Sequence, residues 1–303
     1  MLGTLYVSYR WAGLSLDVTH RWPVLLLIPA CLCLSFYYRY YRIDRYISAG
    51  TEFSAQLLII LLTGTLLSFA AATADFPYRD DILFHLDQEL GFDWRAYLDF
   101  FNTHYIVGRT IHFIYFTIHV QPVLIGIALL WTRRFVRLQQ FVLTVAIALC
   151  LTIAIFILTP AVANYAHLGL QRADFGNLAP SCAFEHIRHL ESLRRGTTHV
   201  VKLDDLEGLI IFPSFHAVAA VLFCWAIWPV RRLRWFFGPI NLLMLVATPV
   251  DGAHYAVDLL GGAAVAGVAI ALTTYMTRVV CARSIAQPVI LNEAQGLPSS
   301  RPA

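Results

Sequence analysis

Long apolar runs, separated by polar turns, dominate the sequence between residues 23 and 276. An α-helix needs roughly 20 apolar residues to cross a bilayer, and most of these runs approach that length. They are too long for buried strands and lack the alternating pattern of a membrane barrel. The sequence therefore predicts an all-α, multi-pass transmembrane helical bundle. The expected spans are 23–38, 53–74, 108–131, 140–163, 209–229, 235–250 and 254–276.

The low content of charged residues supports the same class. Of the 303 residues, 14% are charged and 58% are hydrophobic, whereas a soluble domain has about 25% charged residues. This composition excludes a soluble fold. We expect the membrane bilayer to surround the chain, and we expect no nucleic-acid partner, no metal and no other cofactor. The sequence does not define an oligomeric state.

Arginine-rich segments alternate along the chain with acidic ones. The basic segments are 39–45, 132–137 and 231–234, and the acidic segments are 75–107 and 164–207. Positively charged loops stay in the cytoplasm. We therefore expect an integral plasma (inner) membrane protein whose acidic segments, and the site beside them, lie on the extracytoplasmic side.

The chain divides into a membrane domain with an extension at each end. Within the domain, residues 75–104 show near-helical apolar spacing and are predicted to lie on the membrane surface as an amphipathic helix, broken at Gly91. Residues 164–207 are predicted to form a lid-like loop with short helices. The predicted parts are an N-terminal arm and first span (1–50), the transmembrane domain (51–277) and a disordered cytoplasmic tail (278–303).

Two histidines lie where apolar runs meet water. His216 is near the start of the run 209–229, and His254 begins the last run. The 38 residues between them correspond to about two crossings of roughly 20 residues, so both imidazoles return to one membrane face. Asp258 follows His254 by four residues, a spacing that places both side chains on one face of a helix.

A His–Asp pair with a second histidine suits covalent phosphoryl transfer. A neutral imidazole is a good nucleophile toward phosphorus, and a carboxylate on its other nitrogen fixes the tautomer and stabilises the charged product. The alkoxide of a phosphoester leaves poorly without a proton, which the second imidazole can supply. The alternative is a satisfied polar pair at a helix end, but ionisable residues at membrane depth are costly and indicate function.

The segments FPSFH (212–216) and HYAVDLLGG (254–262) resemble the second and third signature motifs of the type 2 phosphatidic acid phosphatase superfamily. The resemblance covers roughly residues 55–276 and points in particular to the branch of inositol phosphorylceramide synthases, which are inositolphosphotransferases. It implies a six-helix core, here with an extra N-terminal span, and a phosphatase or phosphotransferase acting on a phospholipid or lipid phosphate. The matching residues are Pro213, Ser214, His216, His254, Asp258, Gly261 and Gly262.

The resemblance also implies a role for each site residue. His254 would be the nucleophile that forms a phosphohistidine, and Asp258 would orient it. His216 would act as acid and base, and Ser214 would donate a hydrogen bond to the phosphate.

Two features of the phosphatases in that superfamily are missing from the sequence. Their first motif, K-x(6)-R-P, has no counterpart, and Ala247 and Thr248 replace the Ser-Arg pair that precedes the second histidine. Because the inositol phosphorylceramide synthase branch also diverges in the first motif, this departure favours that branch. Arg109, Arg172 and Lys202 are the candidate replacements for the missing phosphate-binding cations.

Other polar residues and two other functions stay open at this stage. Asp251 either joins the site or forms a turn and cap before the last helix, and its VDG context favours the turn. His112 and His119, with Tyr115 between them, either line a lipid groove or hydrogen-bond within the bundle. An intramembrane serine protease using Ser214 and His254 would leave His216 and Asp258 unexplained. A non-catalytic lipid-binding or transport membrane protein would keep the fold without the chemistry.

Overall fold

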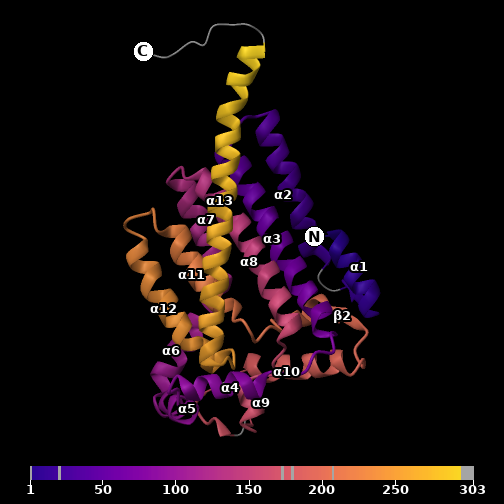
Figure 1. Ribbon diagram of the computed structural model, residues 1–303, viewed down its shortest axis with the longest axis vertical. Helices are drawn as coiled ribbons and strands as arrows, with labels where there is room; N and C mark the ends of the chain where they lie inside the picture. Colours follow the sequence, from indigo (N-terminus) through magenta and orange to yellow (C-terminus); the bar gives the residue numbers. More distant parts are fainter. Residues whose placement is uncertain (1, 20–21, 172–173, 179–180, 207, 295–303) are drawn as a thin grey trace.

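The structure, a computed structural model, describes residues 2–19, 22–171, 174–178, 181–206 and 208–294. Figure 1 shows a bundle of long helices with shorter helices across one end, and the predicted all-α membrane fold is confirmed. The elements in chain order are α1 (Leu2–Ala12), β1 (Ser15–Asp17), α2 (Trp22–Tyr40), α3 (Arg45–Ala72), α4 (Asp80–Glu89), α5 (Trp94–Thr103), α6 (Tyr105–Phe116), the 3-10 helix η1 (Thr117–His119), α7 (Gln121–Trp131), α8 (Phe135–Leu158), α9 (Asn164–His167), α10 (Ser181–Arg194), β2 (Val200–Lys202), the 3-10 helix η3 (Leu203–Asp205), α11 (Phe215–Ile227), α12 (Arg234–Asp251) and α13 (Ala256–Ala294).

Four helices in the described part of the chain are long and apolar enough to cross a membrane: α2, α3, α8 and the first part of α13. A bent pair, made of α6 with η1 and α7, provides a fifth crossing if it is counted as one span. α11 and α12 occupy the places of the predicted spans 209–229 and 235–250. The chain is therefore a multi-pass membrane protein in which α11, with 13 residues, is shorter than a full crossing.

The predicted span 209–229 becomes helical later than expected. Residues 208–214 are not helical, and α11 starts at Phe215. Pro213 disfavours helical geometry in the residue before it. Ser214 then caps the helix, because its side chain accepts a hydrogen bond from the N–H of Ala217 at 3.4 Å. His216 is thereby placed in the first turn of α11.

The predicted span 108–131 is bent by 57° between α6 and α7. Pro122 lies in the first turn of α7, where its missing N–H would have no helical partner in any case. The single turn η1 joins the two pieces. α6 therefore has its own direction and reaches the short helices at one end of the bundle (Figure 1).

The helices α4, α5, α9 and α10 lie across that end (Figure 1). Residues 75–104 form α4 and α5, and the chain breaks at Gly91, whose φ of +74° suits glycine. Asp93 caps α5 by accepting a hydrogen bond from the N–H of Ala96 at 3.0 Å. Part of the apolar surface of this segment is buried, with Leu83 only 4% exposed, whereas Ile82 and Leu90 are 52% and 56% exposed. The amphipathic segment thus packs on the bundle as well as forming its outer surface.

Small residues let the central helices approach each other. Apolar side chains gain little by leaving lipid for protein, so close packing decides which helices pair. Gly64 of α3 faces Leu149 of α8, where an added Cβ would lie 2.0 Å from the leucine side chain. Thr144 of α8 and Thr273 of α13 are buried and share a hydrogen bond of 2.9 Å. Helix α8 therefore packs against both α3 and α13, and α8 and α13 in turn pack against α11.

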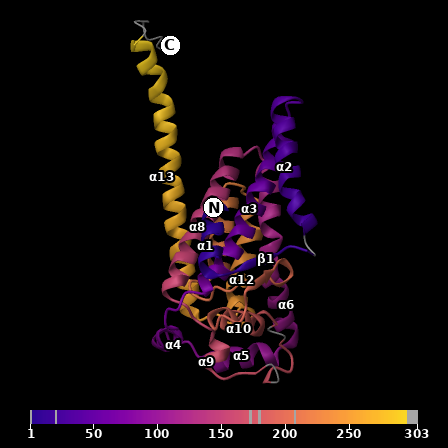
Figure 2. The ribbon, with the colours of Figure 1, turned by 90° about the vertical axis from the view of Figure 1, so that its right-hand side faces the viewer.

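Both ends of the chain contain structure that the sequence did not predict. In the N-terminal arm, β1 pairs in parallel with β2, with Ser15 opposite Val200. At the other end α13 continues to Ala294, whereas a disordered tail is predicted from residue 278. Residues 278–287 contain neither glycine nor proline, so no residue there ends the helix. Figure 2 shows α13 extending past the other helices, with α2 at the opposite edge.

Candidate active site

His254 lies in the short turn between α12 and α13, with its Nδ1 3.2 Å from Oδ2 of Asp258. The same carboxylate oxygen accepts a hydrogen bond from the N–H of Tyr255 at 2.8 Å. His254 is 3% exposed and Asp258 is fully buried. Because α13 begins at Ala256, His254 precedes the helix and Asp258 lies in its first turn. The four-residue spacing still brings the two side chains together, although His254 itself is not helical.

His216 reaches the same place from α11. The ring centroids of His216 and His254 are 6.4 Å apart, and the ring planes are inclined by 63°. The N–H of Ser214 donates a hydrogen bond to the carbonyl of Asp258 at 3.1 Å, which joins the backbones of the two motif segments. The structure therefore brings together His216, His254 and Asp258. Rings at this separation can contact the same phosphate-sized group.

Gly261 and Gly262 allow α13 to pass close to the segment before α11. A Cβ at Gly262 would lie 2.4 Å from the carbonyl oxygen of Ser214, and a Cβ at Gly261 would lie 2.9 Å from the ring of Phe212. These motif glycines thus set the separation of the two histidine-bearing segments. The side chain of Ser214 is fully buried and caps α11. Its hydrogen bond to a phosphate stays a prediction.

Tyr115 of α6 contacts both histidine segments. Its ring stacks on the ring of His216, with centroids 4.0 Å apart and planes inclined by 16°. Its hydroxyl lies beside Gly252, where a Cβ would be 2.8 Å from the Tyr115 oxygen and 2.6 Å from Cδ2 of His254. In the sequence, the spacing of Tyr115 from His112 and His119 already placed these three residues on one helical face, but the sequence did not reveal the contact of Tyr115 with His216.

A second His–carboxylate pair lies nearby. Nδ1 of His112 on α6 is 2.6 Å from Oδ1 of Asp251, the last residue of α12. The interpretation of Asp251 as a turn and cap before the next helix is therefore wrong, because its side chain is directed to α6. His119 lies further along, in η1, with its ring 6.3 Å from that of Phe116.

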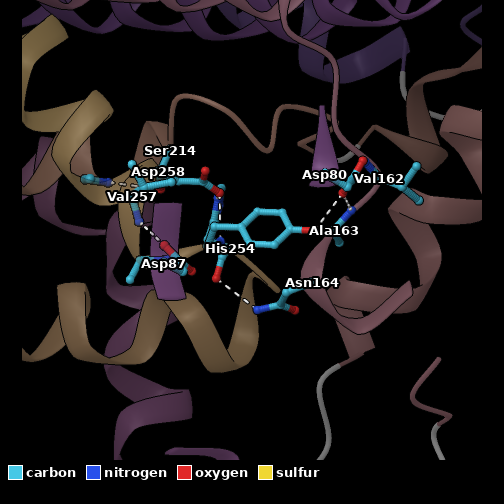
Figure 3. A network of polar contacts seen from close by, with 12 residues as sticks. Asp80, Asp87, Val162, Ala163, Asn164, Ser214, His254, Val257 and Asp258 are labelled. Carbon is cyan, nitrogen blue, oxygen red and sulfur yellow. Dashed lines mark hydrogen bonds and ion pairs between the residues drawn. The ribbon is translucent and has the colours of Figure 1, made fainter. Parts of the chain in front are cut away.

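Two carboxylates of α4 hold the start of α13, as Figure 3 shows. Asp87 accepts hydrogen bonds from the N–H groups of Ala256 and Val257, each at 2.8 Å. Asp80 accepts one from the hydroxyl of Tyr255 at 2.9 Å. The free N–H groups at a helix N-terminus favour a negative charge. Asp87 therefore caps α13 from another helix and fixes the position of the turn that carries the nucleophile candidate.

The sequence alone did not reveal Asp80 and Asp87 as residues of the site. With Leu83 they occupy positions i, i+3 and i+7, which form the buried face of α4. A carboxylate on the apolar face of an amphipathic helix needs hydrogen-bond partners when it is buried. That spacing was the available signal. Apart from Trp94, seven residues after Asp87, the partners belong to segments more than 80 residues away and could not be named.

The electrostatics of the turn favour a neutral imidazole. Burial lowers the pKa of His254 to about 4, and the nearby carbonyl of Ile211 opposes this shift only in part. His254 is therefore unprotonated near neutral pH, as a nucleophile must be. Burial and the negative charge of Asp80 raise the pKa of Tyr255, so its hydroxyl keeps its proton and remains a donor.

The three candidate phosphate-binding cations, Arg109, Arg172 and Lys202, do not lie together in the described part of the chain. Arg109 is exposed on α6, one turn before His112. Lys202 is exposed in β2, on the other side of the view from α6 in Figure 1. Arg172 lies outside the described residues. Among the described residues, no group of three or more His, Cys, Asp or Glu side chains is arranged to hold a metal ion.

The fold and the site together define a multi-pass, all-α membrane protein with two neighbouring histidines at one end of its bundle. The family model described as the PAP2 superfamily matches residues 81–272, and the chain belongs to that superfamily. Members of the superfamily are phosphatases and phosphotransferases of lipid phosphoesters. Comparison with curated proteins and with solved structures finds no match. The superfamily expected from the motifs is confirmed, and the inositol phosphorylceramide synthase-like branch stays a prediction.

Proposed function

We propose that the protein cleaves or exchanges a phosphoester of a membrane lipid through a phosphohistidine formed on His254. The observation that carries this proposal is the buried His254–Asp258 pair with the ring of His216 only 6.4 Å away. This arrangement supplies a nucleophile, an orienting carboxylate and a proton donor within one site. Membership of the PAP2 superfamily supports the same chemistry.

In the first half-reaction, Nε2 of His254 attacks phosphorus. The N–P bond forms, the P–O bond of the ester breaks, and the leaving oxygen takes a proton from His216. Asp258 accepts the hydrogen bond of Nδ1, so the neutral tautomer presents Nε2 and the positive charge of the phosphorylated ring is stabilised.

In the second half-reaction, an acceptor hydroxyl attacks the phosphohistidine. The new P–O bond forms as the N–P bond breaks, and the electron pair returns to His254. When the acceptor is water, His216 takes its proton and the cycle closes as hydrolysis. When the acceptor is an alcohol, the same bonds change and the product is a new phosphoester.

Two positions support the phosphotransferase branch over the phosphatases. Ala247 and Thr248, which replace the Ser-Arg pair, are fully buried. The hydroxyl of Thr248 donates a hydrogen bond to the carbonyl of Met244 at 2.7 Å, within its own helix. The side chains of Ala247 and Thr248 thus lie in the interior of the bundle. We propose that Arg109, Arg172 and the hydroxyl of Ser214 bind the phosphate in their place, in an inositolphosphotransferase-like enzyme.

We propose an active site on the extracytoplasmic side of the plasma (inner) membrane. The arginine-rich turns before α3, α8 and α12 lie at the end of the bundle opposite to α4 and α5 (Figure 1). The acidic helices lie at the same end as the start of α13. Because basic loops stay in the cytoplasm, this arrangement supports a site that faces away from it.

The proposal is tested with purified protein and a panel of phospholipids and lipid phosphates carrying radioactive phosphorus. We expect label to be trapped on the protein and to be acid-labile and base-stable, as a phosphohistidine is. His254→Gln should trap no label. A matched control is His85→Gln, because His85 is an exposed histidine that also faces a carboxylate four residues on, Glu89 at 3.4 Å.

The other functions predict different results. Absence of a labelled protein with every lipid, together with lipid binding or transfer, would favour the non-catalytic carrier. Proteolytic activity that survives His216→Ala and is abolished by Ser214→Ala would favour the intramembrane protease. Equal lipid product from wild type and His254→Gln would refute the phosphohistidine mechanism.

A further inference from the structure

The pair formed by His112 and Asp251 has the same chemistry as the proposed nucleophile pair but no role in the mechanism so far. Nδ1 of His112 lies 2.6 Å from Oδ1 of Asp251. This leaves Nε2 as the ring nitrogen available to a ligand. The side chain of His112 is 28% exposed, whereas that of His254 is 4% exposed. His112 is therefore more accessible than His254.

The carboxylate of this pair also has an unused acceptor. Asp251 is 5% exposed, and its second oxygen, Oδ2, is buried without a hydrogen-bond partner. A buried carboxylate oxygen without a donor costs free energy, and such groups persist where a ligand or a function requires them. The pair is thus unlike a fully satisfied structural contact between two helices.

The position of the His112–Asp251 pair suits contact with an acceptor alcohol rather than with the phosphorus atom. Three residues after His112 on α6, Tyr115 stacks on His216 and lies beside the backbone next to His254. Residues three apart on a helix lie about 5–6 Å from each other, so His112 is one helical turn outside the two reacting rings. A group bound to Nε2 of His112 would lie beside the phosphate and would not occupy the place of the phosphate.

The surroundings of His112 indicate the direction from which a ligand arrives. On α6, Phe113 follows His112 directly and is 74% exposed, and Ile106 in the first turn is 78% exposed. Exposed apolar side chains on a helix of a membrane protein face lipid. A ligand that reaches His112 along α6 therefore comes from the bilayer.

We propose that His112, held by Asp251, is the base for a membrane-borne alcohol acceptor, a proposal that rests on the phosphohistidine mechanism. The O–H group of the alcohol donates a hydrogen bond to Nε2 of His112. The alcohol oxygen then attacks the phosphohistidine, so that the P–O bond forms and the N–P bond breaks. The proton of the alcohol moves to His112. His112 returns this proton to solvent, from which His216 regains the proton it gave to the leaving alcohol. Water attack uses His216 alone. The enzyme thus has separate bases for transfer and for hydrolysis.

The test measures how the phosphoenzyme divides between two acceptors. Protein labelled on His254 in detergent micelles is mixed with a long-chain primary alcohol, and labelled ester and inorganic phosphate are quantified over time. His112→Gln and Asp251→Asn are compared with wild type and with His85→Gln. A general base contributes roughly 100-fold or more. We expect both site variants to lower the ester-to-phosphate ratio by about that factor, with label formation and hydrolysis retained.

Each outcome separates this proposal from the function on which it rests. Absence of label in wild type would remove the phosphohistidine mechanism itself. Normal labelling with an unchanged ratio in both variants would overturn the role of His112 as acceptor base. A third outcome is loss of labelling in both variants, with the ester-to-phosphate ratio preserved in the residual phosphoenzyme. This result would show that the pair only holds α6 against α12, and it would equally overturn the role of His112 as acceptor base.

Discussion

The phenol ring of Tyr115 lies face to face with the imidazole of His216, 4.0 Å away and nearly parallel. His216 belongs to α11, whereas Tyr115 belongs to α6, the first part of a pair of helices bent by 57°. A stacked neighbour restricts rotation of the imidazole about its side-chain bonds. The orientation of the proposed acid is thus set by a helix that carries none of the three triad residues.

Removing the stacked ring should slow the chemical step. Aromatic pairs contribute about 0.5–1.5 kcal/mol beyond burial, so Tyr115→Leu should lower kcat by roughly 2- to 12-fold with little change in KM. Tyr115→Phe keeps the stack and should retain most of the activity. Steady-state kinetics on one lipid substrate would measure both. Equal losses in Tyr115→Phe and Tyr115→Leu would instead assign the effect to the hydroxyl beside Gly252.

The cap supplied by Asp87 should matter for stability. Asp87 is fully buried and accepts hydrogen bonds from two N–H groups of α13 and from Nε1 of Trp94 at 2.9 Å. Asp87→Asn removes the charge and one acceptor, which should cost about 1–3 kcal/mol. Thermal unfolding in detergent would report a lower Tm. Asp81→Asn is the matched control, because the side chain of Asp81 is almost fully exposed on the same helix; equal Tm values for the two variants would contradict the prediction.

The close approach at Gly262 should not tolerate a methyl group. A Cβ there would meet the carbonyl oxygen of Ser214 at 2.4 Å, which is backbone and cannot rotate away. Gly262→Ala should force α13 and the α11 segment apart, at a cost of about 1–3 kcal/mol, and should lower activity because the two rings separate. Gly267→Ala, on the same helix with nothing within 4 Å of the added Cβ, should be neutral or slightly stabilising. Tm and kcat of both variants would decide.

The buried imidazole of His254 should make stability depend on pH in a defined window. Its pKa is about 4 in the folded state and about 6.5 when unfolded, so between these values the unfolded chain binds more protons. The free energy of unfolding should therefore fall as pH decreases from about 6.5 to 4, by about 3 kcal/mol for this group. Denaturation in detergent across this range should give a shallower pH slope for His254→Asn than for wild type. Identical slopes would show that His254 does not titrate in this way.

Local rules sufficed for much of the fold. The length of the apolar runs predicted the helical membrane bundle, and the glycine at 91 marked the break between α4 and α5. The start of α11 was misplaced because apolar character continues through Ile211, while the chain is held extended by Pro213 and by the bond from Ser214 to Asp258. The latter is a tertiary contact that no local rule contains.

The candidate site was predictable only where its chemistry is local. His254 and Asp258 are four residues apart, and membrane topology brought His216 to the same face. The contacts of Tyr115 and Asp87 with the site depend on how α6 and α4 pack against it, and the partner of Asp251 is 139 residues away. Spacing identified the polar face of each helix but could not identify what that face touches.

The capping of α13 by Asp87 also limits how a substrate can arrive. α4 is tied by hydrogen bonds to the residues that directly follow His254, and α5 is tied to α4 through Trp94. These two helices cover the segment that carries the proposed nucleophile, and moving them away would remove the cap of α13. A phospholipid that reacts as we propose should therefore enter from the side of the bundle, with its tails still among the other lipids and only its head group passing beneath α4 and α5.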